Sequence, residues 1–215
     1  MKNIFFVCTV GLSLMAFTHI FSRYQEGWIS LFDGRSLSGW KVGDNASTFH
    51  VDSGMIIVHG NTAHLFYDGG VKNHQFKNFE FKADVMTMPG ANSGIYFHTE
   101  FQQGGWPKKG YEVQVNNSHT DWRRTGSLYA VKDVKEVYVK DKEWFTEYFK
   151  VQGKHVIIQI NGKTVVDYTE PVDVLRERAG GDSLRVISSG TFALQGHDPN
   201  SLVYFKNIMV RPLAE

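Results

Sequence analysis

Short stretches in which apolar and polar residues alternate recur along most of this chain. The clearest is Phe79-Glu-Phe-Lys-Ala-Asp-Val-Met86, in which four apolar side chains share one face and three charged side chains share the other. A period of two places successive side chains on opposite sides of an extended backbone, so the pattern predicts a half-buried strand. Asn161-Gly162 separates two further alternating runs, 156–160 and 163–168, and is the strongest short indication of a β-hairpin. Only 172–179 has the pattern of a short helix.

The alternating runs are separated by turns that contain glycine, proline, asparagine or aspartate. We expect strands at 49–58, 64–67, 79–86, 94–99, 111–115, 127–131, 136–139, 144–152, 155–160, 163–168, 191–195 and 203–210. Many short strands at this spacing are typical of two antiparallel sheets packed face to face. The chain has 215 residues and shows no linker or low-complexity segment, so one domain is expected.

The first residues have the pattern of an export sequence. Met1-Lys-Asn is followed by an apolar run over 4–17, which is shorter than the roughly 20 residues that a membrane-spanning helix needs. We predict a signal peptide over 1–22, a single domain over 23–215, and a periplasmic or extracellular location, with an uncleaved anchor as the alternative. Cleavage would remove Cys8, the only cysteine, and would leave no stable membrane insertion. Stability would then come from core burial and not from disulfides.

Charge and motifs exclude several classes of function. The chain has 23 Lys and Arg against 22 Asp and Glu, and a net charge of +1 gives no indication of nucleic acid binding. The sequence contains no HExxH, paired-cysteine, GxGxxG or phosphate-loop motif and no nucleophile elbow. We assign no cofactor, although a divalent cation stays open. The charge balance suits a neutral partner such as a carbohydrate, and nothing indicates the oligomeric state.

Several segments together resemble one family over about 28–212. They are Leu31-Phe-Asp-Gly-Arg-Ser-Leu-Ser-Gly-Trp40, Asn92-Ser-Gly-Ile-Tyr-Phe97, Gly110-Tyr-Glu-Val-Gln114, Thr125-Gly-Ser-Leu-Tyr129, Trp144, Asn161-Gly162, Leu194-Gln-Gly-His197 and Phe205-Lys-Asn-Ile208. The chain resembles the 3-keto-disaccharide hydrolase domain family, formerly a domain of unknown function. The resemblance implies a two-sheet antiparallel jelly-roll sandwich of the concanavalin A-like lectin/glucanase type. It also implies cleavage of glycosides whose sugar carries a ketone at carbon 3. The chain departs from the family pattern at Ser127, Ala130 and 197–203.

The expected strand 111–115 carries the most informative polar residues. Alternation puts Glu112 and Gln114 on one face, with Tyr111, Val113 and Val115 facing the core. Ordinary retaining glycosidases use two carboxylates about 5 Å apart. Glucanases that share the implied fold carry them as Glu-x-Asp-x-x-Glu, whereas this chain reads Glu112-Val-Gln-Val-Asn-Asn117. The strand therefore lacks the second and third acids, although a distant partner such as Asp84 or Asp121 stays open.

A 3-keto sugar offers a route that needs only one base. The ketone acidifies the hydrogen on carbon 2, a base removes it, the enolate expels the group on carbon 1, and water adds to the product. We take Glu112 as the candidate base or orienting group. His197 is a second candidate for proton transfer, since histidine titrates near neutral pH and since it follows Gln195 by two positions.

The remaining candidates are sugar-binding side chains. They are Gln114, Asn92, Ser93, Tyr96, His98, Arg124, Tyr129, Gln195 and Trp106. For several, a structural role is the alternative: turn formation for Asn92 and Ser93, a core position for Tyr129, a solvated loop for Arg124. Three classes of function remain open, namely an enzyme acting on an oxidised glycoside, a carbohydrate-binding module without catalysis, and a spacer domain.

Overall fold

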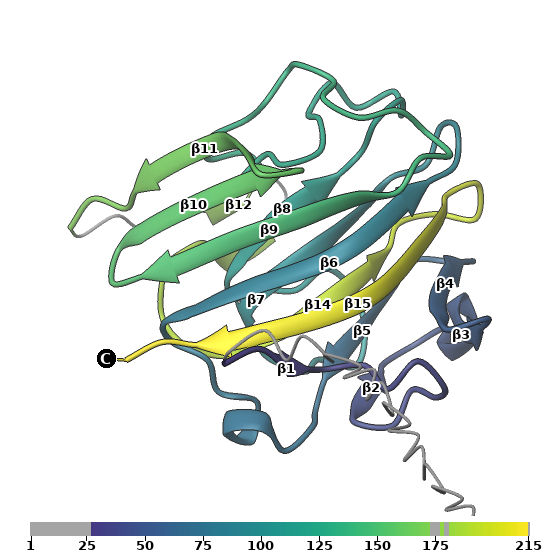
Figure 1. Ribbon diagram of the computed structural model, residues 1–215, viewed down its shortest axis with the longest axis horizontal. Helices are drawn as coiled ribbons and strands as arrows, with labels where there is room; N and C mark the ends of the chain where they lie inside the picture. The colour runs from purple at the N-terminus through teal and green to yellow at the C-terminus, as the bar shows by residue number, and fades with distance from the viewer. Residues whose placement is uncertain (1–26, 173–176, 179–180, 215) are drawn as a thin grey trace, which may run out of the picture.

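Two antiparallel β-sheets packed face to face form the protein, as seen in the computed structural model, which describes residues 27–172, 177–178 and 181–214 (Figure 1). The larger sheet has eight strands in the order β11-β10-β9-β6-β15-β4-β3, with β1 paired to β15. Its strands are β1 (Ile29–Ser30), β3 (Phe49–Asp52), β4 (Met55–His59), β6 (Phe79–Thr87), β9 (Phe145–Gln152), β10 (His155–Ile160), β11 (Lys163–Thr169) and β15 (Leu202–Pro212). The jelly-roll sandwich predicted from the sequence is confirmed.

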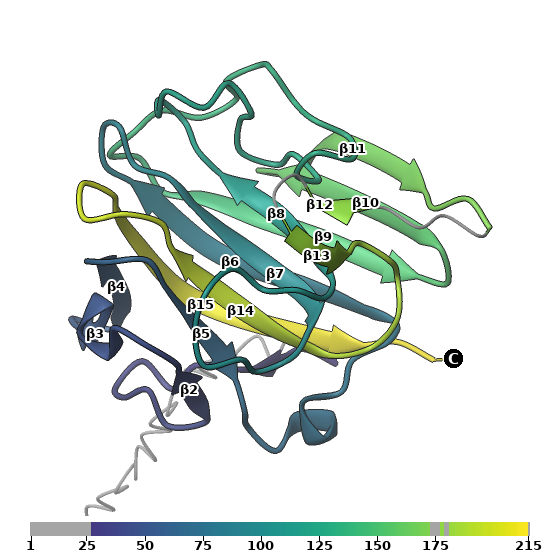
Figure 2. The ribbon, with the colours of Figure 1, turned by 180° about the vertical axis from the view of Figure 1, so that it is seen from behind.

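The smaller sheet has five strands in the order β2-β5-β14-β7-β8. They are β2 (Trp40–Val42), β5 (Ala63–Tyr67), β14 (Thr191–Gly196), β7 (Ser93–Thr99) and β8 (Tyr111–Val115). A separate pair joins β12 (Glu177–Arg178) to β13 (Gly181–Leu184), and two short 3-10 helices span Ala46–Thr48 and Val71–His74. Figure 2 shows the loop between β7 and β8 crossing the outer face of the five-stranded sheet.

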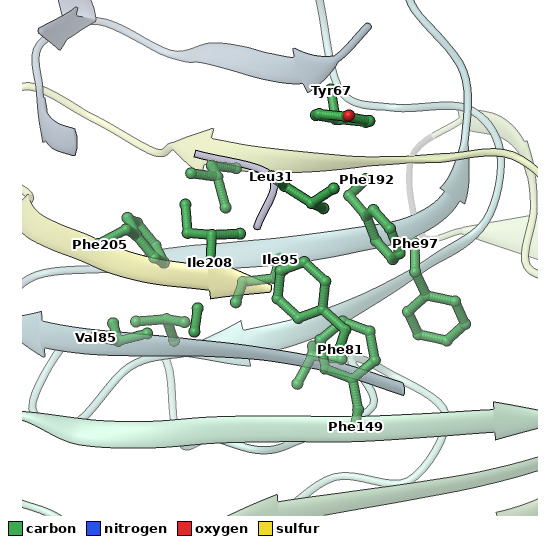
Figure 3. Close-up of a cluster of buried hydrophobic side chains, with 14 of the residues drawn as sticks. Leu31, Tyr67, Phe81, Val85, Ile95, Phe97, Phe149, Phe192, Phe205 and Ile208 are labelled. Carbon is green, nitrogen blue, oxygen red and sulfur yellow. The ribbon is translucent and has the colours of Figure 1, made fainter. Parts of the chain in front are cut away.

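Aromatic side chains fill the space between the two sheets. The rings of Phe81 and Phe149 stack with their centroids 4.8 Å apart, and Phe192 from the opposite sheet lies 4.7 Å from Phe81 (Figure 3). The four apolar residues of the alternating run in β6 are fully buried, as their period of two predicts. Each such ring contributes about 2–3 kcal/mol on burial, so this core holds the sheets in fixed positions.

Some expected elements differ in the structure. The run 49–58 is a hairpin, because Ser53 and Gly54 both take positive φ angles and reverse the chain. The expected strands at 127–131 and 136–139 are wrong. Leu128 makes only isolated bridges. The chain turns back after it, where the Val131 N–H donates to the Leu128 carbonyl. Ala130 permits this turn with a φ of 55°, a backbone region that glycine adopts more readily.

Two further expectations fall partly or wholly outside the described residues. Within 172–179, Glu177 and Arg178 form a strand and not a helix, while 173–176 and 179–180 are not described. The predicted signal peptide over 1–22 also lies outside the described residues. Among the residues that are described, no helix has the length and apolar character needed to cross a membrane.

Candidate functional site

The outer face of the five-stranded sheet carries polar side chains that are almost fully buried. On β8, Tyr111, Val113 and Val115 point into the core with no exposed surface. Glu112 and Gln114 point to the opposite face, where they are 5% and 1% exposed. The strand therefore has the two faces that the sequence predicted, and its outer face carries the polar pair.

Three strands bring Glu112, Tyr96 and Gln195 together. One carboxylate oxygen of Glu112 accepts a hydrogen bond from the Tyr96 hydroxyl at 2.9 Å, and the other accepts one from Gln195 Nε2 at 2.8 Å. Gln195 Nε2 also lies 3.1 Å from the Tyr96 hydroxyl. The carboxylate lies across β7 at Gly94, where a Cβ would overlap Glu112 Oε1. Both carboxylate oxygens are thus occupied, and the group orients a phenol and an amide.

A second line of polar contacts leads from Gln114 to His119. Gln114 Nε2 donates to Asn92 Oδ1 at 2.8 Å, and Asn92 Nδ2 lies 3.3 Å from His119 Nδ1. The backbone N–H of Asp121 donates to the same Nδ1 at 3.1 Å. A ring nitrogen that accepts a hydrogen bond carries no proton, so neutral His119 holds its proton on Nε2.

The environment of His119 favours its neutral form. Burial lowers the pKa of His119, and the neighbouring His197 ring lowers it further. The ring therefore stays neutral at and above neutral pH, and it presents an Nε2–H that can donate a hydrogen bond.

His197 has the opposite arrangement of its ring nitrogens. It follows β14 directly, and its Nδ1 lies 2.7 Å from Asp198 Oδ2. Burial raises the pKa of Asp198, but hydrogen bonds from His197, Ser201 and the Asn200 N–H outweigh it and lower the pKa overall. An ionised carboxylate only accepts hydrogen bonds, so Nδ1 of His197 carries the proton and Nε2 keeps a lone pair. His197 is thus an oriented base of the histidine–aspartate type.

The two histidines lie next to each other. Their ring centroids are 5.4 Å apart at an interplanar angle of 65°. One ring offers an N–H donor and the other a lone pair, which is the combination that a proton transfer with charge stabilisation requires. Trp106, on the loop between β7 and β8, lies 5.5 Å from the His197 ring and 5.5 Å from the His64 ring, and it is 43% exposed.

The same residues also form the one metal-type cluster found in the described part of the chain. Ligand atoms of His119, His197 and Asp198 lie within 4.8 Å of one another, and two imidazoles with a carboxylate suit a first-row divalent ion. An ion on Nε2 of His119 would require a proton on Nδ1, where the Asp121 N–H already points. Nδ1 of His197 is bonded to Asp198, an arrangement that leaves Nε2 of His197 available to a proton or to an ion. The hydrogen bond at Nδ1 of His119 therefore disfavours an ion at that ring and favours a neutral donor there.

The structure does not bring every predicted residue to this cluster. His98 alternates with Tyr96 in sequence, yet its φ of 55° turns the ring away, against Phe79 at 5.6 Å. Its Nε2 lies 3.0 Å from the Lys77 carbonyl, and its Nδ1 accepts the Ser188 N–H at 3.2 Å. Burial lowers the pKa of His98 to about 4. His98 therefore ties loops to the sheet and lies apart from the Glu112 group.

Three other candidates hold parts of the site in place. Ser93 donates to the Gln195 carbonyl at 2.6 Å and links β7 to β14. Arg124 donates from Nη1 to the carbonyl oxygens of His119 and Asp121, both at 2.8 Å, which fixes the loop that carries His119. The Tyr129 backbone N–H bonds to the Glu112 carbonyl at 3.0 Å, and its partly buried ring has a pKa raised by burial.

Sequence reasoning missed His119, Asp198 and His64 as members of this group. Asp198 adjoins His197 in sequence, so its adjacency was available as an indication. His119 lies in a loop after β8, and only the turn at 116–121 brings it to the sheet face. His64 alternates with the buried Leu65 on β5, and its ring lies 5.3 Å from Tyr96.

Comparison with known proteins places the chain in a family. The model of the 3-keto-alpha-glucoside-1,2-lyase-like domain matches residues 27–211. A 3-keto-disaccharide hydrolase of Bacteroides thetaiotaomicron is 24% identical over 236 aligned positions, which cover 87% of this chain and 79% of that protein.

Solved structures show the same fold. A putative glycosyl hydrolase from Parabacteroides distasonis superposes with a TM-score of 0.73 at 24% identity, covering 88% of this chain and 95% of the other. The carbohydrate-binding module CBM66 from Bacillus subtilis gives a TM-score of 0.56 at 12% identity, with 80% and 95% covered. On the match over 27–211, the chain belongs to the 3-keto-alpha-glucoside-1,2-lyase-like domain family.

Proposed function

We propose that this protein cleaves the glycosidic bond of a 3-keto-glycoside at the outer face of the five-stranded sheet. The observation that carries the proposal is the pair His119 and His197, whose rings meet edge-on with centroids 5.4 Å apart and whose hydrogen bonds at Nδ1 place the proton on different ring nitrogens. The family match and the name of the Bacteroides relative supply the substrate class. We also propose that the protein acts after export, on the basis of the apolar run near its start.

The first step is removal of the hydrogen on carbon 2. A ketone at carbon 3 makes that hydrogen acidic, and Nε2 of His197 takes the proton while the electron pair of the C–H bond forms the enolate. Asp198 stabilises the imidazolium through its 2.7 Å contact with Nδ1. A positioned base of this kind contributes about 100- to 10,000-fold in rate.

The Nε2–H of His119 supports the same step as a neutral donor to the enolate oxygen. Because burial lowers the pKa of His119, its ring is neutral at neutral pH, and the Nε2–H donor is in place before charge develops on the enolate oxygen. Removal of one such donor typically costs about 100- to 1,000-fold.

The second step breaks the bond between carbon 1 and the leaving oxygen. The oxyanion re-forms the carbonyl at carbon 3, and the π pair between carbons 2 and 3 becomes the double bond between carbons 1 and 2. The electron pair of the C1–O bond leaves with the oxygen, to which the imidazolium of His197 returns its proton. Water then adds across that double bond, with the hydroxyl on carbon 1 and a proton on carbon 2. One histidine thus serves as base and then as acid, so no second carboxylate is needed.

Glu112 acts in this scheme as an orienting group. Its two oxygens hold the Tyr96 hydroxyl and the Gln195 amide beneath the surface on which the sugar is proposed to bind. Tyr96 is 1% exposed and Gln195 2% exposed, so their positions are fixed before a sugar arrives. Preorganised polar groups of this kind reduce the cost of ordering on binding.

The alternative function is a carbohydrate-binding module without catalysis. The fold shared with CBM66 and the absence of a carboxylate pair on β8 both favour it. A module of this kind would bind an intact sugar on the same face and would not distinguish native from oxidised forms. The two functions therefore differ in whether a 3-keto-glycoside is turned over.

The test is turnover of a 3-keto-glucoside and of the unoxidised glucoside in deuterated water. We expect cleavage of the oxidised sugar only, with deuterium at carbon 2, and loss of both in His197→Ala and Asp198→Asn. His155→Ala is the matched control, because His155 makes the same 2.7 Å contact with Asp167 on the other sheet.

Two outcomes would overturn the proposal. Equal binding of both sugars without cleavage would assign the protein to the binding modules. Activity that disappears with a chelator and returns with one divalent ion would make His119, His197 and Asp198 metal ligands and not proton carriers.

A further inference from the structure

A pocket opens beside the polar cluster on the same face of the sheet. It lies between β5, at His64 and Phe66, and the loop residues 102–105, with Gly43, Asp44, Thr62 and Ala63 completing its wall. None of the steps on carbons 1 and 2 uses this pocket. A contact joins it to the base, because Thr62 Oγ1 donates to the His197 carbonyl at 2.7 Å.

The wall of the pocket is held in place by its own backbone. The Asp44 N–H bonds to the Gln103 carbonyl at 2.6 Å, and Gln103 Nε2 returns a bond to Asp44 Oδ1 at 2.9 Å. A Cβ at Gly43 would overlap the Gln103 carbonyl, and one at Gly104 would overlap Asp44 Oδ2. At Gly43 the overlap is with backbone, so the two segments approach so closely that only glycine fits there, and the wall is therefore preformed.

Gln102 sets the position of the rest of this loop. Its Nε2 donates to the carbonyls of Gly104 and Trp106, both at 2.8 Å, and its Oε1 accepts the Lys108 N–H at 3.0 Å. Trp106 is thereby fixed between His64 and His197 while 43% of its surface stays exposed. An indole held in this way is a platform on which an apolar face of a sugar ring can stack.

The chemistry of the lining selects a class of ligand. The pocket is lined by amides, a hydroxyl, the Asp44 carboxylate and the rings of His64 and Phe66, and no lysine or arginine is among the residues that line it. A carboxylate with no lysine or arginine beside it in the lining disfavours an anionic ligand such as a sugar phosphate. Donors and acceptors around an aromatic surface suit a neutral polyhydroxylated ring.

We propose that Trp106 is the platform that binds the sugar that leaves when a disaccharide is cleaved, and that the pocket beside it, which has room for about one water-sized group, accepts a hydroxyl of that sugar. The inference rests on the proposed function, because it takes the His197 side of Trp106 as the place where the oxidised sugar reacts. Its location follows from Trp106 and Thr62, which each connect the pocket to His197.

The test compares a 3-keto-disaccharide with a 3-keto methyl glycoside, whose leaving group is too small to reach the pocket. We expect Trp106→Ala to raise KM for the disaccharide about tenfold while kcat is retained, because the indole platform is lost and a tenfold change corresponds to about 1.4 kcal/mol. KM for the methyl glycoside should change by less than about twofold, and Trp106→Phe should restore most of the affinity for the disaccharide.

Trp122→Ala is the matched control, because Trp122 is 46% exposed but lies against Arg123 and Lys135, away from the pocket. An equal rise in KM for both substrates in Trp106→Ala would overturn the proposal, since Trp106 would then contact the oxidised sugar. An unchanged KM for the disaccharide would overturn it as well.

A binding measurement separates this inference from the proposed function. If the wild-type protein cleaves neither substrate, the proposed function fails, and binding of the unoxidised disaccharide is followed by calorimetry. Weaker disaccharide binding in Trp106→Ala, with unchanged binding in Trp122→Ala, would still support the pocket. Equal binding by all three proteins would reject it.

Discussion

Gly94 of β7 lies against the Glu112 carboxylate of β8, at a point where any Cβ would overlap Glu112 Oε1. The missing side chain allows the carboxylate to cross β7 and to reach Tyr96 and Gln195. The Glu112 carboxylate of β8 can therefore bond to side chains of β7 and β14, because Gly94 leaves room for it over β7. This relationship makes Gly94 a position at which a single methyl group tests the geometry of the site.

We expect Gly94→Ala to displace the Glu112 carboxylate and to break at least one of its two hydrogen bonds. Turnover of a 3-keto-glycoside should fall about tenfold or more, because a shift of about 1 Å in an orienting group is enough for such losses. Steady-state kinetics measures the effect, with Gly70→Ala as control, since a Cβ at Gly70 meets nothing within 4 Å. Equal activity in both variants would show that the Glu112 position does not matter.

Replacing Glu112 by glutamine keeps the size of the side chain but removes one of its two hydrogen-bond acceptors. An amide can accept only through its oxygen, so one of the two donors, Tyr96 or Gln195, loses its acceptor. We expect unfolding free energy to fall by about 1–3 kcal/mol, the cost of an unsatisfied buried polar group. Denaturant titration measures it, and Glu143→Gln at an exposed position is the control. A Glu112→Gln protein as stable as the control would contradict the buried hydrogen-bonded role.

Arg124 is expected to act through His119 as a positioning residue. Its Nη1 holds the carbonyls of His119 and Asp121, and Lys cannot reproduce the planar guanidinium. Arg124→Ala should lower kcat about tenfold with little change in KM, and Arg124→Lys should recover only part of it. Arg35→Ala, at an exposed position, should leave both constants unchanged. A change confined to KM would instead indicate direct contact with the sugar.

His98 should make the protein less stable in mild acid. Burial lowers its pKa to about 4 from an ordinary 6.5, so the unfolded chain binds a proton before the folded one does. Stability is then complete above about pH 6.5 and falls as pH decreases towards 4, by about 3 kcal/mol in total. Urea titrations at several pH values measure the slope. The slope should persist in His155→Ala and disappear in His98→Gln; persistence in His98→Gln would assign it to other groups.

Glu147 should have an opposite effect at higher pH. It is fully buried on β9, and burial raises its pKa well above the ordinary value, with the Gly126 N–H offsetting only part of the shift. The folded state keeps the proton that the unfolded state loses, so stability falls as pH rises above about 4.5 until the folded pKa is reached. Glu147→Gln should therefore stabilise the protein at pH 7 and not at pH 4. A gain of equal size at both pH values would exclude ionisation as its cause.

The sequence predicted which way the β8 side chains point, but not where His98 and His119 lie. Strict alternation placed Glu112 and Gln114 on the outer face because β8 is regular and its other face is sealed in the core. The same reasoning misplaced His98, because a positive φ angle interrupts β7 and rotates the ring out of the alternation. It missed His119, because the turn that brings this residue to Asn92 depends on Arg124 and on contacts between distant segments.

The turn at 126–132 bonds along β8, the outermost strand of its sheet, through the Gln114 N–H to Ser127 and the Tyr129 N–H to Glu112. An uncovered strand edge invites pairing with another chain. By occupying that edge, this short segment protects the strand that carries Glu112 and Gln114 from self-association. Sequence changes that remove these backbone bonds would therefore uncover the edge of β8 and expose the protein to aggregation.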